Sequence, residues 1–212
     1  MLKTNHILVA GGYPRTGSSL LKNIIINYKK ITEGFCYLFI EDFCYAKKSL
    51  KNNSPLLIKR HPYEIIMSGV RYHQLGLEPW LHIKKKELNY NSYFKVLKNK
   101  KTIKEKILFE IKHISSKKIN NICFDINNIN NNFWIKIEDL YNKNSQEETA
   151  DKIILKYNLK KYFKECVVES CKTKINKTKD NLDYTWCDIF DKEIYNSIEK
   201  FCVKDCVSIM GY

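Results

Sequence analysis

Hydrophobic residues follow two patterns along the chain. Short, uninterrupted apolar runs lie at 6–10, 56–59 and 133–137, and such runs predict strands. The run at 56–59 shows no alternation with polar residues, which is typical of a parallel strand covered on both faces. Other stretches repeat apolar residues at helical spacing. They predict helices over 18–29, 36–48, 62–72, 145–157 and 191–208, and a further short strand is expected at 30–33.

Strands that alternate with helices predict an α/β fold with right-handed βαβ units and a parallel sheet. A chain of 212 residues fits one domain, 1–212, and is long enough to bury a core. The segment 84–132 is rich in Lys and Asn and has helical periodicity around 103–114, so we expect a helical insertion there. Its end, 120–132, is of low complexity and is expected to be a loop or a frayed helix.

A glycine-bearing turn joins the first strand to the first helix. Four residues separate Gly12 from Gly17, which is the spacing of the phosphate loop of NTPases. Such a turn aims backbone N–H groups and a helix N-terminus at an anion, usually a phosphate. Ser18 stands where an NTPase needs the lysine that serves the β- and γ-phosphates. We therefore expect a nucleotide without a γ-phosphate.

Arginine is rare in this chain and is placed at strand-to-helix junctions. Of 37 Lys and Arg residues, only Arg15, Arg60 and Arg71 are arginines. Arg15 lies inside the glycine-bearing turn, and Arg60 and Arg71 flank the segment that follows strand 56–59. A guanidinium is planar, always charged and able to pair with phosphate in two places. The placement predicts two anion sites.

Three segments resemble the sulfotransferases that use 3′-phosphoadenosine 5′-phosphosulfate (PAPS). Pro14–Leu20 is similar to that family's 5′-phosphosulfate loop, in the Arg-bearing form of the carbohydrate and tyrosylprotein enzymes. Arg60 and Ser68, with Pro62 between them, resemble its 3′-phosphate motif. Trp134–Leu140 resembles its later strand and "EDL" segment. The likeness extends over residues 6–80 and, more loosely, over 133–212.

The resemblance implies a three-layer α/β/α fold with a central parallel sheet, like that of the P-loop NTPases. It also implies transfer of the sulfuryl group of PAPS to an acceptor hydroxyl, without a metal. The cofactor-binding residues that it implies are Arg15, Thr16, Gly17, Ser18 and Ser19 at the 5′ end, with Arg60 and Ser68 at the 3′-phosphate. Arg15 would also stabilise charge on the bridging oxygen as the sulfuryl group leaves. The acceptor stays open between a glycan, a protein tyrosine and a small alcohol; a carbohydrate is favoured, and 84–132 is expected to form part of its pocket.

A hydroxyl acceptor needs a general base within hydrogen-bond reach. Glu33 is expected in this role, because some members of the resembled family carry a catalytic Glu just after the first helix. We expect Glu33 to lie at the end of the second strand. Glu41 and His82 are the alternatives, and a solvated surface residue is an equally good interpretation of each.

The formal net charge of +14 comes from lysines spread along the chain. Because Lys, Asn and Ile are all abundant, a compositional bias is favoured over a dedicated nucleic-acid or membrane partner, and no nucleic acid is expected to bind. The chain starts with a polar segment and has no apolar run of about 20 residues. A cytoplasmic enzyme is expected, with the secretory pathway as the alternative if an anchor has been removed.

The eight cysteines contain no Cys-x2-Cys pair, so no structural zinc site is expected. Most are expected to be reduced core residues. The alternative is a disulfide among Cys166, Cys171, Cys187 and the pair Cys202 and Cys206. That pair would share one face of the expected C-terminal helix.

Two other functions compete with sulfuryl transfer. A P-loop kinase or NTPase with a degenerate loop would lack both its lysine and a clear Walker-B strand that ends in Asp. A basic nucleic-acid-binding module would cluster arginines with stacking aromatic residues, whereas the charge here is dispersed lysine.

Overall fold

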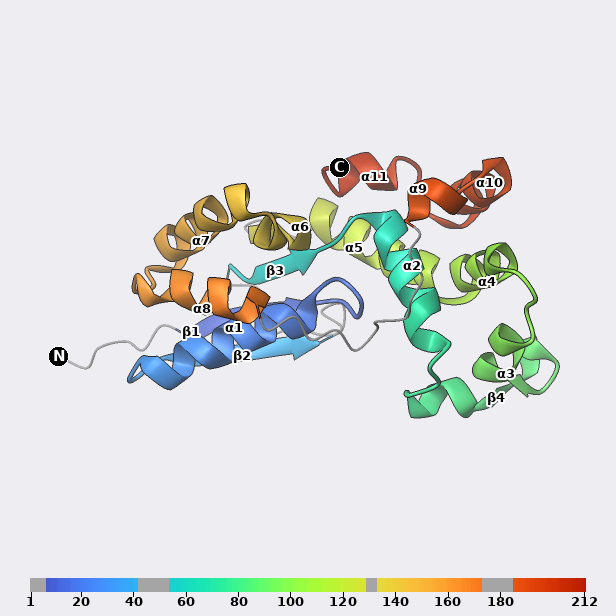
Figure 1. Ribbon diagram of the computed structural model, residues 1–212, viewed down its shortest axis with the longest axis horizontal. Helices are drawn as coiled ribbons and strands as arrows, with labels where there is room; N and C mark the ends of the chain where they lie inside the picture. Colours follow the sequence, from blue (N-terminus) through green and yellow to red (C-terminus); the bar gives the residue numbers. More distant parts are fainter. Residues whose placement is uncertain (1–6, 42–53, 129–132, 173–184) are drawn as a thin grey trace. The chain divides into compact units, whose positions relative to one another are not determined.

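The computed structural model describes residues 7–41, 54–128, 133–172 and 185–212, and the chain divides into two compact units. Unit 1 combines residues 1–60 with 125–175, and unit 2 combines 61–124 with 176–212. Figure 1 labels the α-helices and the strands β1 to β4. That the chain forms one domain with an insertion stays a prediction.

Unit 1 is built on a four-stranded parallel sheet flanked by helices. Its strands are β1 (Ile7–Gly12), β2 (Cys36–Glu41), β3 (Leu56–Lys59) and β6 (Phe133–Lys136), in the order β2-β1-β3-β6. Gly12 is paired with Glu41 on one side and with Ile58 on the other, and Lys59 is paired with Lys136. Because the strands are parallel, their carboxyl ends meet at one edge of the sheet.

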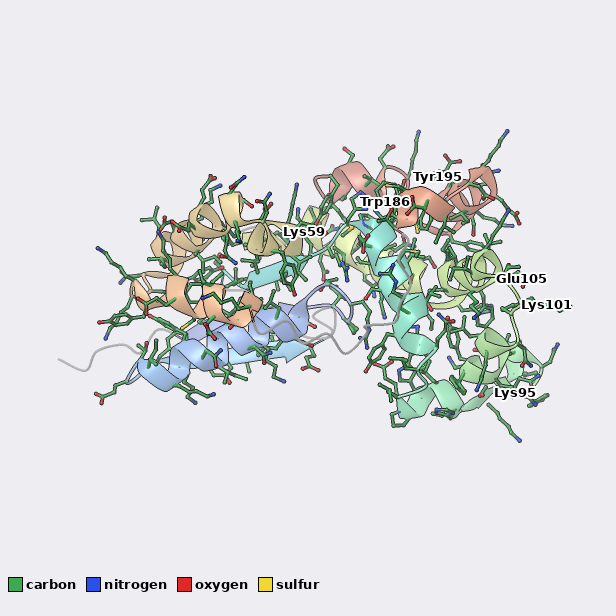
Figure 2. All side chains as sticks on the ribbon, viewed as in Figure 1. Lys59, Lys95, Lys101, Glu105, Trp186 and Tyr195 are labelled. Carbon is green, nitrogen blue, oxygen red and sulfur yellow. The ribbon has the colours of Figure 1, made fainter. Side chains whose placement is uncertain are left out.

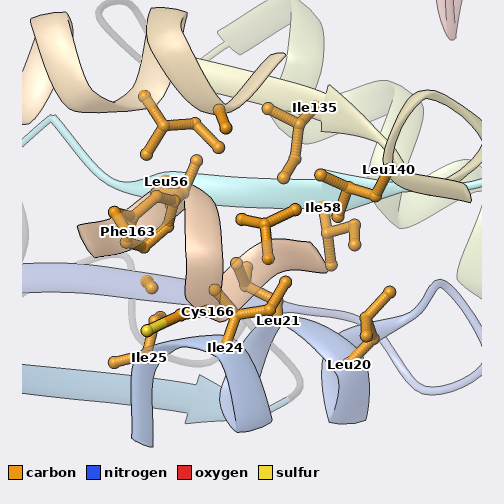
Figure 3. Packing of buried hydrophobic residues seen from close by; sticks show 14 of the residues in the cluster. Leu20, Leu21, Ile24, Ile25, Leu56, Ile58, Ile135, Leu140, Phe163 and Cys166 are labelled. Atoms are coloured by element: carbon orange, nitrogen blue, oxygen red, sulfur yellow. The ribbon is translucent and has the colours of Figure 1, made fainter. Parts of the chain in front are cut away.

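The core of unit 1 lies between the sheet and its helices, which are α1 (Ser18–Ile31), α6 (Ile137–Tyr141), α7 (Lys143–Tyr157) and α8 (Tyr162–Lys172). Figure 3 shows Leu21 and Ile24 of α1 facing Leu56 and Ile58 of β3, with Phe163 of α8 beside them. All five side chains are buried. The uninterrupted apolar run of β3 is therefore explained by burial on both faces of a central strand.

Unit 2 is mainly helical. Its elements are α2 (Pro62–His73), η2 (Pro79–His82), β4 (Lys84–Lys85), η3 (Lys86–Leu88), β5 (Asn91–Ser92), α3 (Tyr93–Lys98), α4 (Ile103–Glu110), η4 (Ile111–Ser115), most of α5 (Ser116–Asn128), α9 (Trp186–Ile189), α10 (Lys192–Phe201) and α11 (Cys206–Ile209). The strands β4 and β5 form an antiparallel hairpin, and η4 is a π-helical turn between α4 and α5. The expected helical periodicity over 103–114 is confirmed.

A buried polar network joins four elements of unit 2. The Glu110 carboxylate accepts hydrogen bonds from Tyr93 Oη (2.5 Å) and Ser115 Oγ (2.7 Å), and it lies 2.8 Å from His73 Nδ1. All four side chains are buried. A Cβ on Gly69 would lie 2.5 Å from Glu110 Oε1, so the glycine leaves room for this carboxylate.

The second strand differs from its prediction. Residues 36–41 form β2, not a helix, and the strand expected at 30–33 is wrong because α1 continues to Ile31. The rest of the expected helix, 42–48, lies outside the described residues. Tyr37, Phe39 and Ile40 suit a strand. Over six residues, however, their pattern also fits a helix, and only the pairing with β1 decides the outcome.

Two helix boundaries also differ. The helix predicted from Ser145 begins at Lys143, because Asn142 Oδ1 accepts the N–H of Asn144 at 2.9 Å. Ser145 Oγ instead donates to the carbonyl of Asp139 at 3.1 Å. The expected C-terminal helix is split into α10 and α11, so Cys202 and Cys206 do not share a helix face.

The described cysteines are all free thiols. Cys123, Cys166, Cys202 and Cys206 are buried, as expected for core residues, whereas Cys36 and Cys187 are exposed and Cys171 is half-buried. Cys44 lies outside the described residues. Among the described helices, none is long and apolar enough to span a bilayer.

Candidate anion-binding site

The loop between β1 and α1 is a tight turn with two left-handed residues. Arg15 has φ 73° and Gly17 has φ 97°. The carbonyl of Tyr13 accepts both the N–H of Thr16 (3.2 Å) and its hydroxyl (2.7 Å). The buried Tyr13 side chain donates a hydrogen bond to Asp125, which anchors the start of the loop. Thr16 therefore shapes the loop, and both of its donors are used within it.

The start of α1 presents unsatisfied N–H groups to solvent. The first intrahelical bond runs from the N–H of Leu21 to the carbonyl of Gly17, at 3.1 Å. In the described part of the chain, the N–H groups of Gly17, Ser18 and Ser19 bond to no acceptor. Gly17 offers no capping side chain, and the first turn has no acidic residue. This helix start therefore attracts an anion through both its donors and its dipole.

Both loop glycines are required by close packing against the neighbouring elements. A Cβ on Gly17 would lie 2.3 Å from Ile137 Cδ1, and one on Gly12 would lie 2.7 Å from Ile58 Cγ2. Ile58 lies two residues before Arg60. The close approach therefore holds the loop against the strand that leads to Arg60.

Cationic side chains gather at the carboxyl edge of the sheet. Arg15 lies in the loop after β1, and Arg60 directly follows β3. Lys59 and Lys136 are paired at the ends of β3 and β6, and Figure 2 marks Lys59 at this position. Burial lowers the pKa of Lys59 and the charge of Lys136 lowers it further, whereas two carboxylates of α6 raise it. A bound anion would act on Lys59 in the same direction as these carboxylates.

The candidate bases lie in three different places. Glu41 ends β2 opposite Gly12, and its carboxylate is 3.0 Å from Lys22 Nζ. Glu33 is exposed and precedes β2, so it lies at the amino edge of the sheet, about 20 Å along the strand from the loop. The expectation that Glu33 ends the second strand is wrong. His82 belongs to unit 2, where its Nε2 is 2.8 Å from the carbonyl of Gly76.

The structure thus brings together most of the predicted cofactor-binding residues. Arg15, Gly17, Ser18, Ser19 and Arg60 share the carboxyl edge of unit 1. Ser68 lies half-buried on α2 in unit 2. Sequence reasoning missed Lys59 and Lys136. Lys59 ends one predicted strand, and Lys136 is the residue before the last in another, so their positions at strand ends were the available signal.

Within the described residues, no group of three His, Cys, Asp or Glu side chains could hold a metal ion. No protein-family model matches the chain, and no curated protein is significantly similar to it. The geometry of the site and the sequence motifs are therefore the basis for a functional proposal.

Proposed function

We propose that the chain is a PAPS-dependent sulfotransferase that transfers a sulfuryl group to an acceptor hydroxyl, with a carbohydrate favoured. The observation that carries the proposal is the shared edge of the sheet. At this edge, Arg15 and the first N–H groups of α1 lie next to the end of β3, which leads into Arg60. Arg15 and Arg60, one from each motif that resembles the family's phosphate sites, thus follow adjacent strands. A nucleotide with phosphates at both ends of its ribose needs two such sites close together.

We also propose that the sheet belongs to a three-layer α/β/α fold of the P-loop NTPase type. The support is a parallel sheet in which the glycine-bearing loop follows β1, one of the two central strands, and leads into a covering helix. Ligands of open parallel sheets bind beyond the carboxyl ends of the strands. The loop is at this edge, next to the end of β3.

In this proposal the loop residues act on the leaving group. The acceptor oxygen bonds to sulfur while the bond from sulfur to the bridging oxygen breaks, and the electron pair stays on that oxygen. The Arg15 guanidinium and the N–H groups of Gly17, Ser18 and Ser19 stabilise the charge that develops there. Arg60 holds the 3′-phosphate, and the part expected of Ser68, which lies in unit 2, stays a prediction.

Glu41 is the base that the sheet register favours. It lies at the same edge as the loop, whereas Glu33 lies at the opposite edge. The ion pair with Lys22 fixes the Glu41 carboxylate beside the start of α1. Glu41 would take the proton of the acceptor hydroxyl as the new oxygen–sulfur bond forms.

A cytoplasmic location is part of the proposal. The described cysteines are free thiols, and thiols persist in the reducing cytoplasm. The proposed reaction uses no metal.

Thermal-shift measurements separate the proposal from a P-loop kinase or NTPase. Adenosine 3′,5′-bisphosphate should stabilise the protein more than ATP with magnesium, because Ser18 stands where the NTPase lysine would be. Stabilisation by ATP with magnesium alone would overturn the assignment.

Transfer of radiolabelled sulfate from PAPS to a panel of sugars, peptides and alcohols then tests the reaction itself. Arg15→Ala should abolish transfer and keep the melting temperature. Lys30→Ala, at the far end of α1, is the matched control and should leave both unchanged. A Glu41→Gln variant with undiminished transfer would remove Glu41 from the mechanism.

A further inference from the structure

Unit 2 contains a small module in which apolar side chains are exposed to solvent. The module, residues 75–101, comprises η2, the β4–β5 hairpin and α3. Leu81, Leu88, Tyr93 and Leu97 form its core, together with Phe109 of α4. Leu77, Ile83 and Tyr90 lie outside this core and are 62%, 60% and 68% exposed.

Short-range contacts join the segments that carry these three side chains. His82 Nε2 is 2.8 Å from the carbonyl of Gly76, and the His82 ring is 5.0 Å from that of Phe94 on α3. These contacts fix the turn that carries Leu77 and Ile83. The hairpin pairs Lys84 with Ser92 and thereby joins Ile83 to the segment that carries Tyr90.

Tyr90 combines an exposed ring with an unfavourable backbone conformation. Asn89 and Tyr90 have φ 52° and 59°, in the left-handed region that bulky residues rarely adopt. The tip is fixed by the N–H of Tyr90, which donates to the carbonyl of Lys85, and by Asn91 Nδ2, which donates to the carbonyls of Leu88 and Asn89. The backbone strain at Tyr90 is thus not offset by burial of its ring, which indicates that this side chain has a role outside the core.

The net charge is concentrated in and beside this module. The segment 84–118 has 12 lysines and 3 glutamates, so it contributes +9 of the formal +14. Two of the three glutamates are used internally, because Glu110 is buried and Glu105 caps α4. The lysines are spread along the chain, but the acidic residues that would balance them are scarce here.

The exposed lysines of the module lack acidic partners. Within the described residues, Lys84, Lys86, Lys95 and Lys101 form no ion pair. Lys104, just beyond the module, differs from them because it is paired with Asp191 and Glu193. Figure 2 shows the side chains of Lys95 and Lys101 extending away from the ribbon.

From this combination we propose that the module docks on the surface of an anionic lipid bilayer. Leu77, Ile83 and Tyr90 would enter the boundary between headgroups and acyl chains, and the lysines would contact anionic headgroups. A soluble polyanion would explain the lysines but not the two exposed aliphatic side chains. A single-stranded nucleic acid would favour stacked aromatic rings over Leu and Ile. The proposal is independent of sulfuryl transfer.

Vesicle co-sedimentation of the full chain tests the proposal. The protein should sediment with vesicles of phosphatidylcholine and phosphatidylserine at about 0.15 M salt, and much less with phosphatidylcholine alone. The variant Leu77→Ser/Ile83→Ser/Tyr90→Ser should bind the anionic vesicles about tenfold more weakly or worse. Lys84→Gln/Lys86→Gln/Lys95→Gln should show a loss of the same order.

Unit 1 provides matched controls. Leu155 is 86% exposed on α7, and Lys156, Lys160 and Lys161 are exposed without ion pairs among the described residues. Leu155→Ser and Lys156→Gln/Lys160→Gln/Lys161→Gln should keep vesicle binding, and thermal melting shows which variants fold. Three outcomes would overturn the proposal: no sedimentation with anionic vesicles, equal loss in the controls, or tight binding to heparin or RNA that the apolar triple variant retains.

Discussion

At the scale of single residues, Gly17 determines whether the loop can form. It combines a left-handed φ of 97° with a Cβ position only 2.3 Å from Ile137 Cδ1. Gly34, in the turn after α1, has φ 72° but open space around its Cβ position. Substitution of Gly34 would therefore introduce backbone strain alone, whereas substitution of Gly17 would introduce backbone strain and a steric clash.

We predict that Gly34→Ala destabilises the protein by about 1 kcal/mol through strain alone. Gly17→Ala should cost ~3 kcal/mol or more, because Ile137 must also move. Urea unfolding of both variants measures the difference. Equal costs would show that the loop is not held against α6 as described.

Single residues also show where sequence reasoning about the site succeeds and where it stops. The glycine-bearing loop was predictable, because its spacing is local. Lys59 and Lys136 were not singled out, because their meeting depends on the pairing of β3 with β6, strands far apart in the sequence. The placement of Glu33 failed for the same reason, since it depended on where β2 begins.

At the scale of elements, Asn120 fixes the end of α10. Its Nδ2 donates to the carbonyl of Phe201 at 3.0 Å, and its Oδ1 accepts the N–H of Val203 at 2.7 Å. Cys202 between them is extended, which ends the helix. The apolar periodicity of 191–208 cannot reveal this stop, because the side chain that makes it lies more than 80 residues earlier.

Replacing Asn120 should therefore loosen the segment between α10 and α11. Asn120→Ala is expected to cost about 1–3 kcal/mol and to raise amide hydrogen exchange at Val203. Asn127→Ala, at an exposed position of the same helix, should leave both unchanged. If amide exchange at Val203 were unaltered in Asn120→Ala, the two hydrogen bonds of Asn120 would not be what fixes the end of α10.

The buried network of unit 2 predicts a pH dependence of stability. Burial raises the pKa of Glu110, but the hydrogen bonds and charge of His73 and the bonds from Tyr93 and Ser115 outweigh it, so that the net pKa is lowered. A lowered folded pKa stabilises the protein fully above the unfolded carboxyl pKa. This stability is lost as the pH falls through the folded value.

Glu110→Gln should accordingly cost ~3 kcal/mol at neutral pH, because it breaks a buried pair. The difference in unfolding free energy between the wild type and Glu110→Gln should be constant above about pH 5 and should shrink at lower pH. Urea unfolding across this range measures it. If the difference in unfolding free energy grew as the pH fell, the folded pKa of Glu110 would be raised and not lowered, which would contradict the stabilising role of the network.

At the scale of the whole molecule, strands alternating with helices predicted the parallel sheet correctly, but not its strand order. The central claim concerns the edge of that sheet, where Arg15 and Arg60 are proposed to bind opposite ends of one nucleotide. Lys30, near the end of α1 remote from the loop, provides a cation outside this site.

Calorimetric titration of adenosine 3′,5′-bisphosphate and of AMP, which lacks the 3′-phosphate, tests this claim most directly. We predict that Arg15→Ala weakens both nucleotides tenfold or more, ~1.4 kcal/mol, whereas Arg60→Ala weakens the bisphosphate to the level of AMP. Lys30→Ala should change neither. Equal wild-type affinity for the two nucleotides, or an Arg60→Ala variant that keeps full affinity for the bisphosphate, would contradict the account.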